Sequence, residues 1–359
     1  MKIIQMLPCL THGDAIGNEV IAIDRALKSN GYKSVIYAEI LDYRLESTDS
    51  KTIKEWEEPA KDDVIIYHFS IGWRFLPNIR KAKCKKICIY HNITPSHFFK
   101  DYDAAVYNNC KNGLAELKTC ADLFDYCLAD SEFNKQDLIS YGFTCPIDVL
   151  PILIAFDDYK KEPDRKVIRR YKNQPGANIL FVGRVAPNKK QEDIIHAFAL
   201  YKKYYDKDAR LFLIGKYFDT DIYYRRLSSY IKSIGVEDVY LMGHIKFTEI
   251  LAYYTIADVF LCMSEHEGFC VPLAESMFFH VPIIAYDSTA IPSTLGGSGI
   301  LFQEKNMLEV AGLIDRVVKD EELRRTIIAG QDARLKDFDN AVIMDQFMTY
   351  LRNFIASGK

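Results

Sequence analysis

The sequence predicts an α/β protein built from two doubly wound parallel sheets in tandem. A short apolar run at residues 2–10 is followed by a glycine-containing loop and a helix-patterned stretch at 19–32, and the same order restarts at residue 178. The chain has 359 residues, of which 49% are hydrophobic. This is more core-forming sequence than one compact domain normally uses, so we expect two domains.

Strands and helices alternate along the first half. Apolar runs of strand length lie at residues 64–70 and 86–92, and a helical pattern covers residues 112–129. Short apolar runs that alternate with helical stretches are typical of a parallel sheet covered by helices.

The second half repeats this pattern. Residues 178–185 read as a strand, 186–191 as a loop and 192–205 as a helix. Four further strands are expected, at residues 210–215, 239–243, 259–263 and 281–286. Between the halves, residues 157–177 are charged and contain two prolines, which favours a linker with little to bury. Ligands of such sheets bind beyond the carboxyl ends of the strands.

Bulk properties exclude several classes of function. Lys and Arg total 46 against 49 Asp and Glu, for a net charge of -3, so nucleic acid is not expected as the main partner. No apolar run approaches the roughly 18 residues of a membrane-spanning helix. A cytoplasmic protein is expected, and docking on the inner face of a membrane stays open. Its nine cysteines form no C-x-x-C pair, and its histidines form no metal-binding pattern, so free thiols and no metal site are expected.

Two glutamates stand out in the run "SEHEGFCVPLAESMFFH". Pro272 fits the first turn of a helix, which places Glu275 inside the helix and Glu267 in the loop before it. A helix N-terminus attracts anions such as phosphate, and a carboxylate one turn in can accept hydrogen bonds from the vicinal hydroxyls of a ribose. For the bare E-x7-E spacing, ordinary surface residues are the commoner explanation.

A basic loop follows the first strand of the second half. Arg184 and Lys189 could grip a diphosphate and stabilise its charge as it leaves, without a metal. A basic loop alone is usually only solvated, but this one lies at the carboxyl end of a strand.

Several ordered motifs resemble the family 4 retaining glycosyltransferases, of the type that builds bacterial surface polysaccharides. The resemblance runs from "FVGRVAPNKKQEDIIHAF" through "YYTIADVFLCMSEHEGFCVPLAESMFFHVPIIAYDSTAIP", and in the first half through "HGDAIGNEV", "YHNITPSHFF" and "LADSEFNKQDL". It implies the GT-B fold, with two Rossmann-like domains that face each other across a cleft. The domain at residues 1–160 would serve the acceptor and the domain at 161–339 the nucleotide sugar, while a last helix within 340–359, apolar on one face, packs back on the first domain.

The resemblance also implies the site. Arg184 and Lys189 match residues that hold the donor diphosphate, Glu275 the ribose-binding glutamate and Glu267 the one beside the donor sugar. Donor contacts are further expected from the backbone at Gly17, Gly183, Gly268, Phe269, Cys270 and Val271.

In the first domain, His91 matches a histidine that faces the donor sugar, although its spacing alone fits a structural role equally well. Asp14 and Asn18 are candidates for acceptor contact, and Gly13 and Gly17 are expected in the loop before the first helix. Three positions depart from the family pattern: Cys270 and Lys190 stand where glycine is commonest, and Ser293 where many relatives have glutamate.

The expected activity is transfer of a hexosyl group, with mannosyl favoured, from a nucleotide-diphosphate sugar to a hydroxyl of a growing glycan or lipid-linked acceptor. The anomeric configuration would be retained, and no cofactor or metal is expected. Two alternatives stay open, a sugar-nucleotide 2-epimerase of similar fold and a non-catalytic sugar-nucleotide-binding subunit. The basic stretch at residues 80–86 would fit a peripheral membrane contact, although a solvated loop is the commoner explanation.

Overall fold

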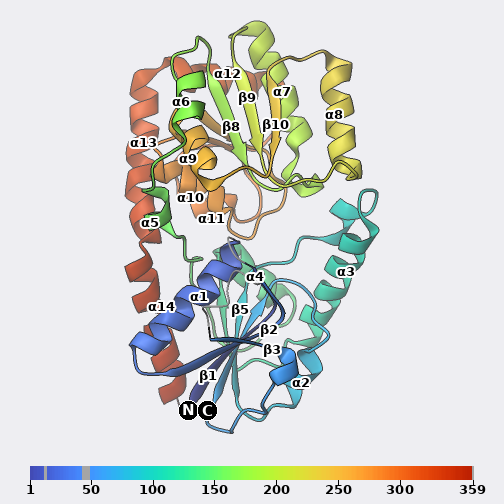
Figure 1. Cartoon of the computed structure of the whole chain (residues 1–359), viewed down its shortest axis with the longest axis vertical. Coiled ribbons are helices and arrows are strands. Elements are labelled where there is room, and N and C mark those ends of the chain that lie inside the picture. Colours follow the sequence, from blue (N-terminus) through green and yellow to red (C-terminus); the bar gives the residue numbers. More distant parts are fainter. Residues whose placement is uncertain (12–13, 43–48, 358–359) are drawn as a thin grey trace. The chain divides into compact units, whose positions relative to one another are not determined.

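Each half of the chain forms a parallel sheet with helices between most successive strands (Figure 1). The structure is a computed structural model that describes residues 1–11, 14–42 and 49–357. It divides into an N-terminal unit (Met1–Ser96, Ala105–Ala155 and Asp337–Lys359) and a C-terminal unit (His97–Ala104 and Phe156–Lys336). Among the described residues, no helix combines the length and apolar character needed to span a membrane.

The N-terminal unit contains a seven-stranded sheet in the order β3-β2-β1-β4-β5-β6-β7. Its strands are β1 (Lys2–Leu10), β2 (Lys33–Leu41), β3 (Ser50–Thr52), β4 (Val64–Phe69), β5 (Lys85–Tyr90), β6 (Tyr126–Ala129) and β7 (Ile147–Val149). Its helices are α1 (Ala15–Ser29), α2 (Leu76–Lys81), α3 (Ala104–Thr119), α4 (Glu132–Ser140) and α14 (Asn340–Ala356). The strand order changes direction between β1 and β4, which is where such sheets bind ligands.

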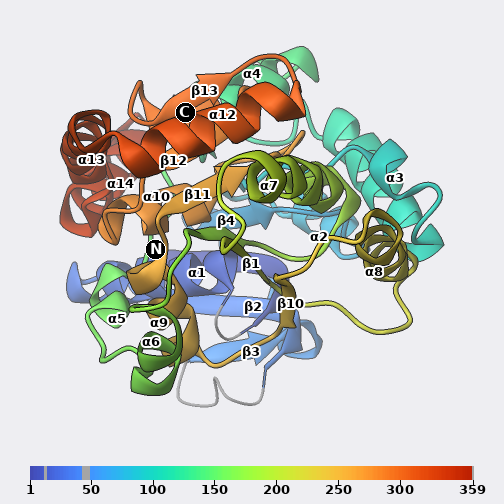
Figure 2. The same ribbon diagram turned by 90° about the horizontal axis from the view of Figure 1, so that it is seen from above.

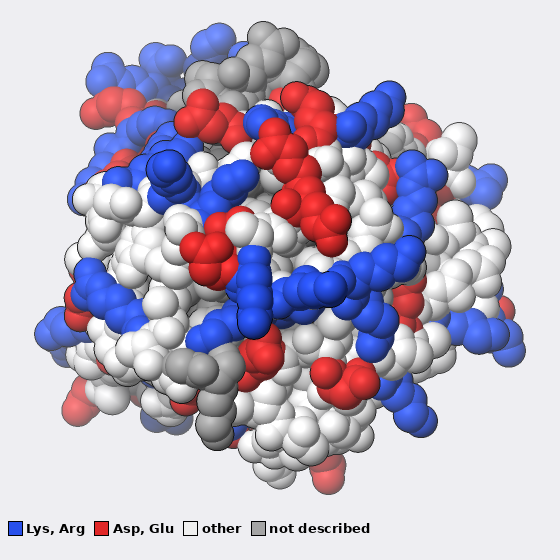
Figure 3. All heavy atoms as spheres, turned by 90° about the horizontal axis from the view of Figure 1, so that it is seen from below, with Lys and Arg blue, Asp and Glu red and all other residues white. Residues whose placement is uncertain are grey.

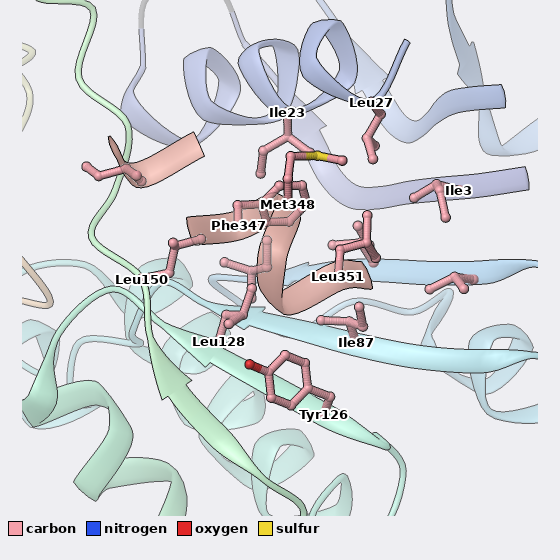
Figure 4. Close-up of a cluster of buried hydrophobic side chains, with 14 of the residues drawn as sticks. Ile3, Ile23, Leu27, Ile87, Tyr126, Leu128, Leu150, Phe347, Met348 and Leu351 are labelled. Carbon is pink, nitrogen blue, oxygen red and sulfur yellow. The ribbon is translucent and has the colours of Figure 1, made fainter. Parts of the chain in front are cut away.

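Helix α14 completes the core of the N-terminal unit (Figure 4). Its Phe347, Met348 and Leu351 are 1–3% exposed and pack against Ile23 and Leu27 of α1. Burying each such side chain contributes about 1.5–3 kcal/mol, so the last helix is an integral part of this unit. The chain therefore returns to its first unit after the second is complete.

The C-terminal unit contains a six-stranded sheet in the order β10-β9-β8-β11-β12-β13. Its strands are β8 (Asn178–Val182), β9 (Arg210–Ile214), β10 (Val239–Gly243), β11 (Val259–Cys262), β12 (Ile283–Tyr286) and β13 (Ile300–Phe302). Its helices are α5 (Phe156–Tyr159), α6 (Arg165–Tyr171), α7 (Gln191–Tyr204), α8 (Ile222–Ile234), α9 (Phe247–Ile256), α10 (Val271–Phe278), α11 (Ile291–Leu295), α12 (Met307–Lys319) and α13 (Glu321–Leu335). Helices α7 and α12 pack together on one side of the sheet, and α6 and α9 on the other (Figure 2). Here the order changes direction between β8 and β11.

Three local expectations were wrong. Residues 157–177 are no linker: they contain α6 and all of α5 but its first residue, and the Tyr171 ring is buried against Phe212 and Tyr253. Residues 112–129 are not one helix, because α3 ends at Thr119 and the apolar end of the run forms β6. At both 157–177 and 112–129, the packing of aromatic or apolar side chains against distant parts of the chain determines the structure, and the local composition and periodicity do not.

The third concerns Gly17, which lies inside α1 and not in a loop. Asp14 caps this helix, because its Oδ1 accepts a hydrogen bond of 2.7 Å from the Gly17 N–H. A Cβ at position 17 would lie 2.2 Å from the Thr11 carbonyl oxygen, so the close approach of the strand end requires glycine. Gly13 lies outside the described residues.

The basic stretch at residues 80–86 uses several of its cations internally. The Lys86 ammonium is buried and donates to the carbonyls of Ala82 and Cys84, and Lys85 donates to the Phe354 carbonyl. On the face seen in Figure 3, Lys and Arg side chains are interspersed with Asp and Glu. Lys81 and Lys83 of this stretch are exposed.

Candidate functional site

The point where the C-terminal sheet changes direction carries a buried ion pair. Lys189 ends the short 3₁₀ turn after β8, and Glu267 lies in the loop after β11. The Lys189 Nζ atom is 2.6 Å from Glu267 Oε1 and 2.5 Å from Oε2, and the two side chains are 19% and 8% exposed. Burial opposes the charged form of Lys189, yet the Glu267 carboxylate raises the pKa of this amine above its usual value. The charged ammonium form of Lys189 is therefore favoured despite its burial.

Backbone contacts fix the two loops to each other. The Asn188 side-chain amide donates to the His266 carbonyl at 3.0 Å, and the Glu265 N–H donates to the Asn188 carbonyl at 2.8 Å. The Glu267 N–H in turn donates to Thr289 Oγ1 at 2.9 Å. The positions of Lys189 and Glu267 are thus set by the scaffold as well as by their mutual attraction.

Arg184 has a different environment from Lys189. Its side chain is exposed, while its carbonyl accepts a hydrogen bond of 3.0 Å from the Gln191 side chain. Gly183, just before it, pairs with the Ile214 carbonyl of β9, and a Cβ on the neighbouring Gly215 would lie 1.9 Å from the Gly183 oxygen. The sequence predicts the same role for Lys189 and Arg184. In the structure, the Lys189 ammonium is mostly buried and paired with Glu267, whereas the Arg184 side chain is exposed.

Glu275 is held by two tyrosines. It lies on α10, and its two carboxylate oxygens accept hydrogen bonds from the hydroxyls of Tyr159, at 2.6 Å, and Tyr254, at 2.5 Å. Burial raises the pKa of Glu275, and the two hydroxyls oppose that rise. Sequence reasoning missed both tyrosines. Tyr159 lies in the stretch 157–177, whose charged composition indicates a linker, and Tyr254 lies within the quoted run that carries the family resemblance.

The entry to α10 departs from ordinary backbone geometry. Cys270 precedes the helix with φ 72°, and Lys190 precedes α7 with φ 52°. These left-handed conformations favour glycine, which explains why the family has glycine at both positions. Gly268, Phe269 and Val271 complete this turn, and Pro272 occupies the first turn of the helix as expected. At the third departure, Ser293 donates to the Ala290 carbonyl within α11.

Cys262, Glu267 and Cys270 bring a carboxylate and two thiols within 4.8 Å of one another. Glu267 already binds Lys189 through both oxygens. The Cys270 thiol hydrogen-bonds to Cys262 and thereby lowers the pKa of the Cys262 thiol. A divalent cation here would have to displace an ammonium group at 2.5 Å, so this set is poorly suited to hold a metal.

In the N-terminal unit, His91 follows β5 with its side chain only 1% exposed. Both ring nitrogens have partners: Nδ1 lies 3.0 Å from Asp130 Oδ2, and Nε2 lies 3.0 Å from Nδ1 of His68. The sequence offered His68 only as a histidine outside any pattern. In this structure His91 therefore presents no available nitrogen to a sugar. Asn18 is partly buried on α1, one residue before the buried Glu19.

Residues 161–333, nearly all of the C-terminal unit, match the family model of the glycosyl transferases group 1. The C-terminal unit belongs to this family. Lys189, Glu267 and Glu275 all lie within the matched glycosyl transferase residues, as does Arg184.

Among curated proteins, the chain is similar to the serotype-specific mannosyltransferase WbdA of Escherichia coli, with 24% identity over 255 residues. The match covers 68% of this chain and 30% of WbdA, so the chain spans about a third of the length of that relative.

Two solved structures are similar over nearly the whole chain. Sucrose-phosphate synthase from Thermosynechococcus elongatus has a TM-score of 0.79 at 17% identity, covering 99% of this chain and 100% of that one. Anabaena HepE, in complex with UDP and glucose, has a TM-score of 0.75 at 18% identity, covering 98% and 100%. These likenesses show the fold. The chain has the GT-B fold, as the resemblance predicted.

Proposed function

We propose that this chain is a retaining glycosyltransferase that moves a hexosyl group, mannosyl by preference, from a nucleoside diphosphate sugar to a hydroxyl of a growing surface glycan. The observation that carries the proposal is the buried Lys189–Glu267 pair, which lies at the switch point of a group 1 glycosyl transferase domain. The mannosyl preference is supported by the likeness to WbdA, a mannosyltransferase.

The ion pair suggests how donor binding works. A diphosphate that reaches Lys189 competes with Glu267 for the same ammonium group, because both are anions and Glu267 already accepts from two of the three N–H donors of the amine. Binding would thus transfer Lys189 from the carboxylate to the phosphate. Glu267 is then released to accept hydrogen bonds from the hydroxyls of the donor sugar.

Charge stabilisation of the leaving diphosphate follows from the same groups. Lys189, the exposed Arg184 and the N-terminus of α10 supply positive charge that grows more favourable as the glycosidic bond breaks. The acceptor hydroxyl attacks the same face, and its proton passes to the leaving phosphate oxygen. No metal is required in this scheme.

Glu275 anchors the nucleoside. Each of its oxygens keeps a lone pair after accepting from Tyr159 or Tyr254, so the carboxylate can also accept from the two ribose hydroxyls. The tyrosines hold it at fixed orientation before the ligand arrives.

Nucleotide binding and turnover test the proposal together. In a thermal-shift panel of GDP, UDP, dTDP and ADP, one nucleotide at 100 times its Kd should stabilise the C-terminal unit by about 2.7 kcal/mol. GDP is expected. A shift with UDP alone overturns the mannosyl preference, and no shift with any of the four overturns the class.

Turnover is then assayed with the matching sugar nucleotide, with and without a glycan acceptor pool. Nucleotide release should require the acceptor, persist in EDTA and yield a product of unchanged anomeric configuration by NMR. Turnover that EDTA abolishes and Mg²⁺ restores contradicts metal independence. Epimerised donor without transfer would identify a 2-epimerase instead.

A further inference from the structure

Four titratable side chains are buried together in the N-terminal unit, outside the donor groups described above. Glu19 comes from α1, His68 from β4, His91 from the end of β5 and Asp130 from the end of β6. Their exposures are 0% for Glu19 and His68, 1% for the His91 side chain and 3% for Asp130. This group, the His68–His91 cluster, lies towards the carboxyl ends of adjacent central strands.

The outer nitrogens of the two imidazoles must both carry protons. His91 Nδ1 lies 3.0 Å from Asp130 Oδ2, and a carboxylate only accepts. His68 Nε2 lies 3.0 Å from Gln5 Oε1, and the Gln5 amide nitrogen donates to the Val20 carbonyl, which fixes the amide with its oxygen towards His68. Each ring therefore uses the one proton of its neutral form at its outer nitrogen.

The inner nitrogens face each other head-on. His68 Nδ1 and His91 Nε2 are 3.0 Å apart, the two ring planes are parallel within 2°, and the ring centroids are 5.3 Å apart. The difference between the two distances corresponds to the two ring radii, so both nitrogens lie on the line that joins the centroids. Without a further positive charge, two lone pairs would point at each other across this distance in a dry interior.

That charge is a proton and not a metal ion. A zinc ion bound by both rings needs lone pairs that converge on a point about 2.0–2.1 Å from each nitrogen. Here the lone pairs oppose each other, and half of their 3.0 Å separation is shorter than such a bond. The same geometry is ideal for a linear N–H···N hydrogen bond.

We propose that Glu19, His68 and Asp130 are positioning residues that hold His91 as a doubly protonated imidazolium, in which His91 donates one proton to Asp130 and shares the other with His68. Three protons on two rings make one cation, and the carboxylate beside His91 assigns it to that ring. His91 is then no proton acceptor for an attacking hydroxyl. It instead fixes the loop after β5 by its two hydrogen bonds.

The surrounding charges agree with this assignment. Burial opposes the charged form of His91, but Asp130, Glu19 and Asp14 raise its pKa to about 9. Burial, together with the charge of His91, keeps the pKa of His68 well below its usual value. Burial also raises the pKa of Glu19 to about 8, against the opposing effect of His91. At neutral pH the cluster thus contains one imidazolium, on His91, opposite Asp130, and burial favours the protonated form of Glu19.

NMR of the full-length protein with ¹⁵N-labelled histidine rings tests this directly. At pH 7 the His91 ring should show two protonated nitrogens, with a strongly deshielded proton shared with His68 that exchanges slowly with solvent. The exposed His196 serves as an internal comparison, and variants at positions 68 and 91 assign the signals. A His91 ring with one bare nitrogen overturns the proposal, and so does zinc that co-purifies in stoichiometric amount with a metal-shifted ring nitrogen.

Two variants that remove a carboxyl group but keep the shape of its side chain show which carboxylate holds His91 in the doubly protonated form. Glu19→Gln resembles a protonated glutamate and should keep the doubly protonated His91 signature at pH 7, because the outer contacts of both rings are intact. Asp130→Asn removes the negative charge and should convert the ring to a neutral one at the same pH. Retention of the signature in Asp130→Asn, or its loss in Glu19→Gln, contradicts the proposal. If Asp130→Asn does not fold, a pH titration of the parent protein decides, since the shared proton should persist at pH 8.

The role of His91 in sugar transfer rests on the proposed function, whereas the NMR test of its protonation state does not. In the parent enzyme, kcat should show no ionisation of His91 between pH 6 and 8. In Asp130→Asn, kcat should fall at least tenfold with an unchanged KM for the donor and acquire a new dependence on pH in this range. A kcat that titrates near pH 6.5 in the parent would show His91 to be an ordinary base. If no transfer is found at all, the proposed function is wrong, but the protonation state of His91 is still decided by NMR, which needs no turnover.

Discussion

The two units each bury an ionic group where their sheet changes direction, but they neutralise it in different ways. In the C-terminal unit, Lys189 and Glu267 are full opposite charges 2.5–2.6 Å apart that derive from two separate loops. In the N-terminal unit, a shared proton joins His68 to His91, with Asp130 as the counter-charge. An anionic ligand can separate Lys189 from Glu267 by binding the ammonium group, whereas His68 and His91 separate only when the shared proton is lost. The ion pair is therefore suited to ligand binding and release, and the His68–His91 cluster to holding a fixed structure.

The largest expected effects lie in the C-terminal unit. Arg184→Ala and Lys189→Ala should each lower kcat by on the order of 10²-fold or more, because each removes charge stabilisation realised as the diphosphate leaves. Only Lys189→Ala should also lower the free energy of unfolding, by about 3 kcal/mol, because it leaves the Glu267 carboxylate buried without its partner. Steady-state kinetics and urea denaturation measure the two effects.

A double variant distinguishes them. Lys189→Met combined with Glu267→Gln removes both charges and should recover most of the lost stability while transfer stays low. Wild-type kcat in either single variant contradicts the assignment. Equal stability of Lys189→Ala and Arg184→Ala would mean that the ion pair is not buried in solution.

If a shared proton holds the His68–His91 cluster together, the N-terminal unit should lose stability as the pH rises. His91 has a folded pKa of about 9, above its usual 6.5, so its contribution is complete below pH 6.5 and is lost as pH rises through 9. Glu19 has a folded pKa of about 8, above its usual 4.5, so the folded state favours low pH and becomes less stable from pH 4.5 to 8. Both act in the same direction, each by about 1.4 kcal/mol per pH unit at most.

Urea denaturation from pH 7 to 9 measures this slope, because the lowered pKa of His68 acts in the opposite direction only around and below its usual 6.5. Glu19→Gln cannot ionise, so it should reduce the slope of unfolding free energy against pH by what one proton contributes, at most about 1.4 kcal/mol per pH unit. His196→Gln, at an exposed position, should leave the slope unchanged. A stability that is flat or rises over this range would show that the cluster is not proton-held.

The sequence predicted the fold well because periodicity and glycine loops report local structure, and the parallel sheets follow from the alternation. It failed at residues 157–177, where charged composition masked Tyr159 and Tyr171, whose partners lie far away in the chain. The family resemblance located Glu267 and Glu275 but not their partners, since a pairing between loops 78 residues apart has no local signature.

His91 illustrates the same limit more sharply. Its position after a strand was correct, but its chemistry depends on His68, Asp130 and Glu19, which lie on three other elements. No spacing rule connects them, because only the sheet order brings β4, β5 and β6 side by side. A histidine outside any motif thus helps to set the protonation state of one inside it, together with Asp130.

Anchoring of the nucleoside provides a smaller test within the C-terminal unit. Glu275→Ala should weaken binding of the bare nucleoside diphosphate by about 1–3 kcal/mol, the value of a hydrogen bond to a charged group, whereas Glu267→Ala should mainly slow transfer. Tyr159→Phe should cost about 1 kcal/mol of affinity because the carboxylate loses one of its two fixed donors. Calorimetry measures these differences, with the exposed Tyr205→Phe as the matched control. Equal losses in Glu267→Ala and Glu275→Ala would show that the roles are assigned wrongly.

The smallest expected effect concerns backbone strain beside the ion pair. The N-terminal unit places Asn92, a residue type that tolerates left-handed geometry, at φ 74°, whereas the C-terminal unit places Lys190 at φ 52°. Lys190→Gly and Lys190→Ala both remove the long contacts of this amine with Glu192 and Glu265, at 3.9 and 3.4 Å. Only glycine relieves the conformation, so Lys190→Gly should be more stable to urea than Lys190→Ala by about 1 kcal/mol. The same pair at Lys203, exposed within α7, should show the opposite order by a similar amount, because glycine there weakens a helix. If alanine is preferred at both positions, residue 190 does not hold the left-handed conformation in solution, and the strain attributed to the C-terminal site is absent.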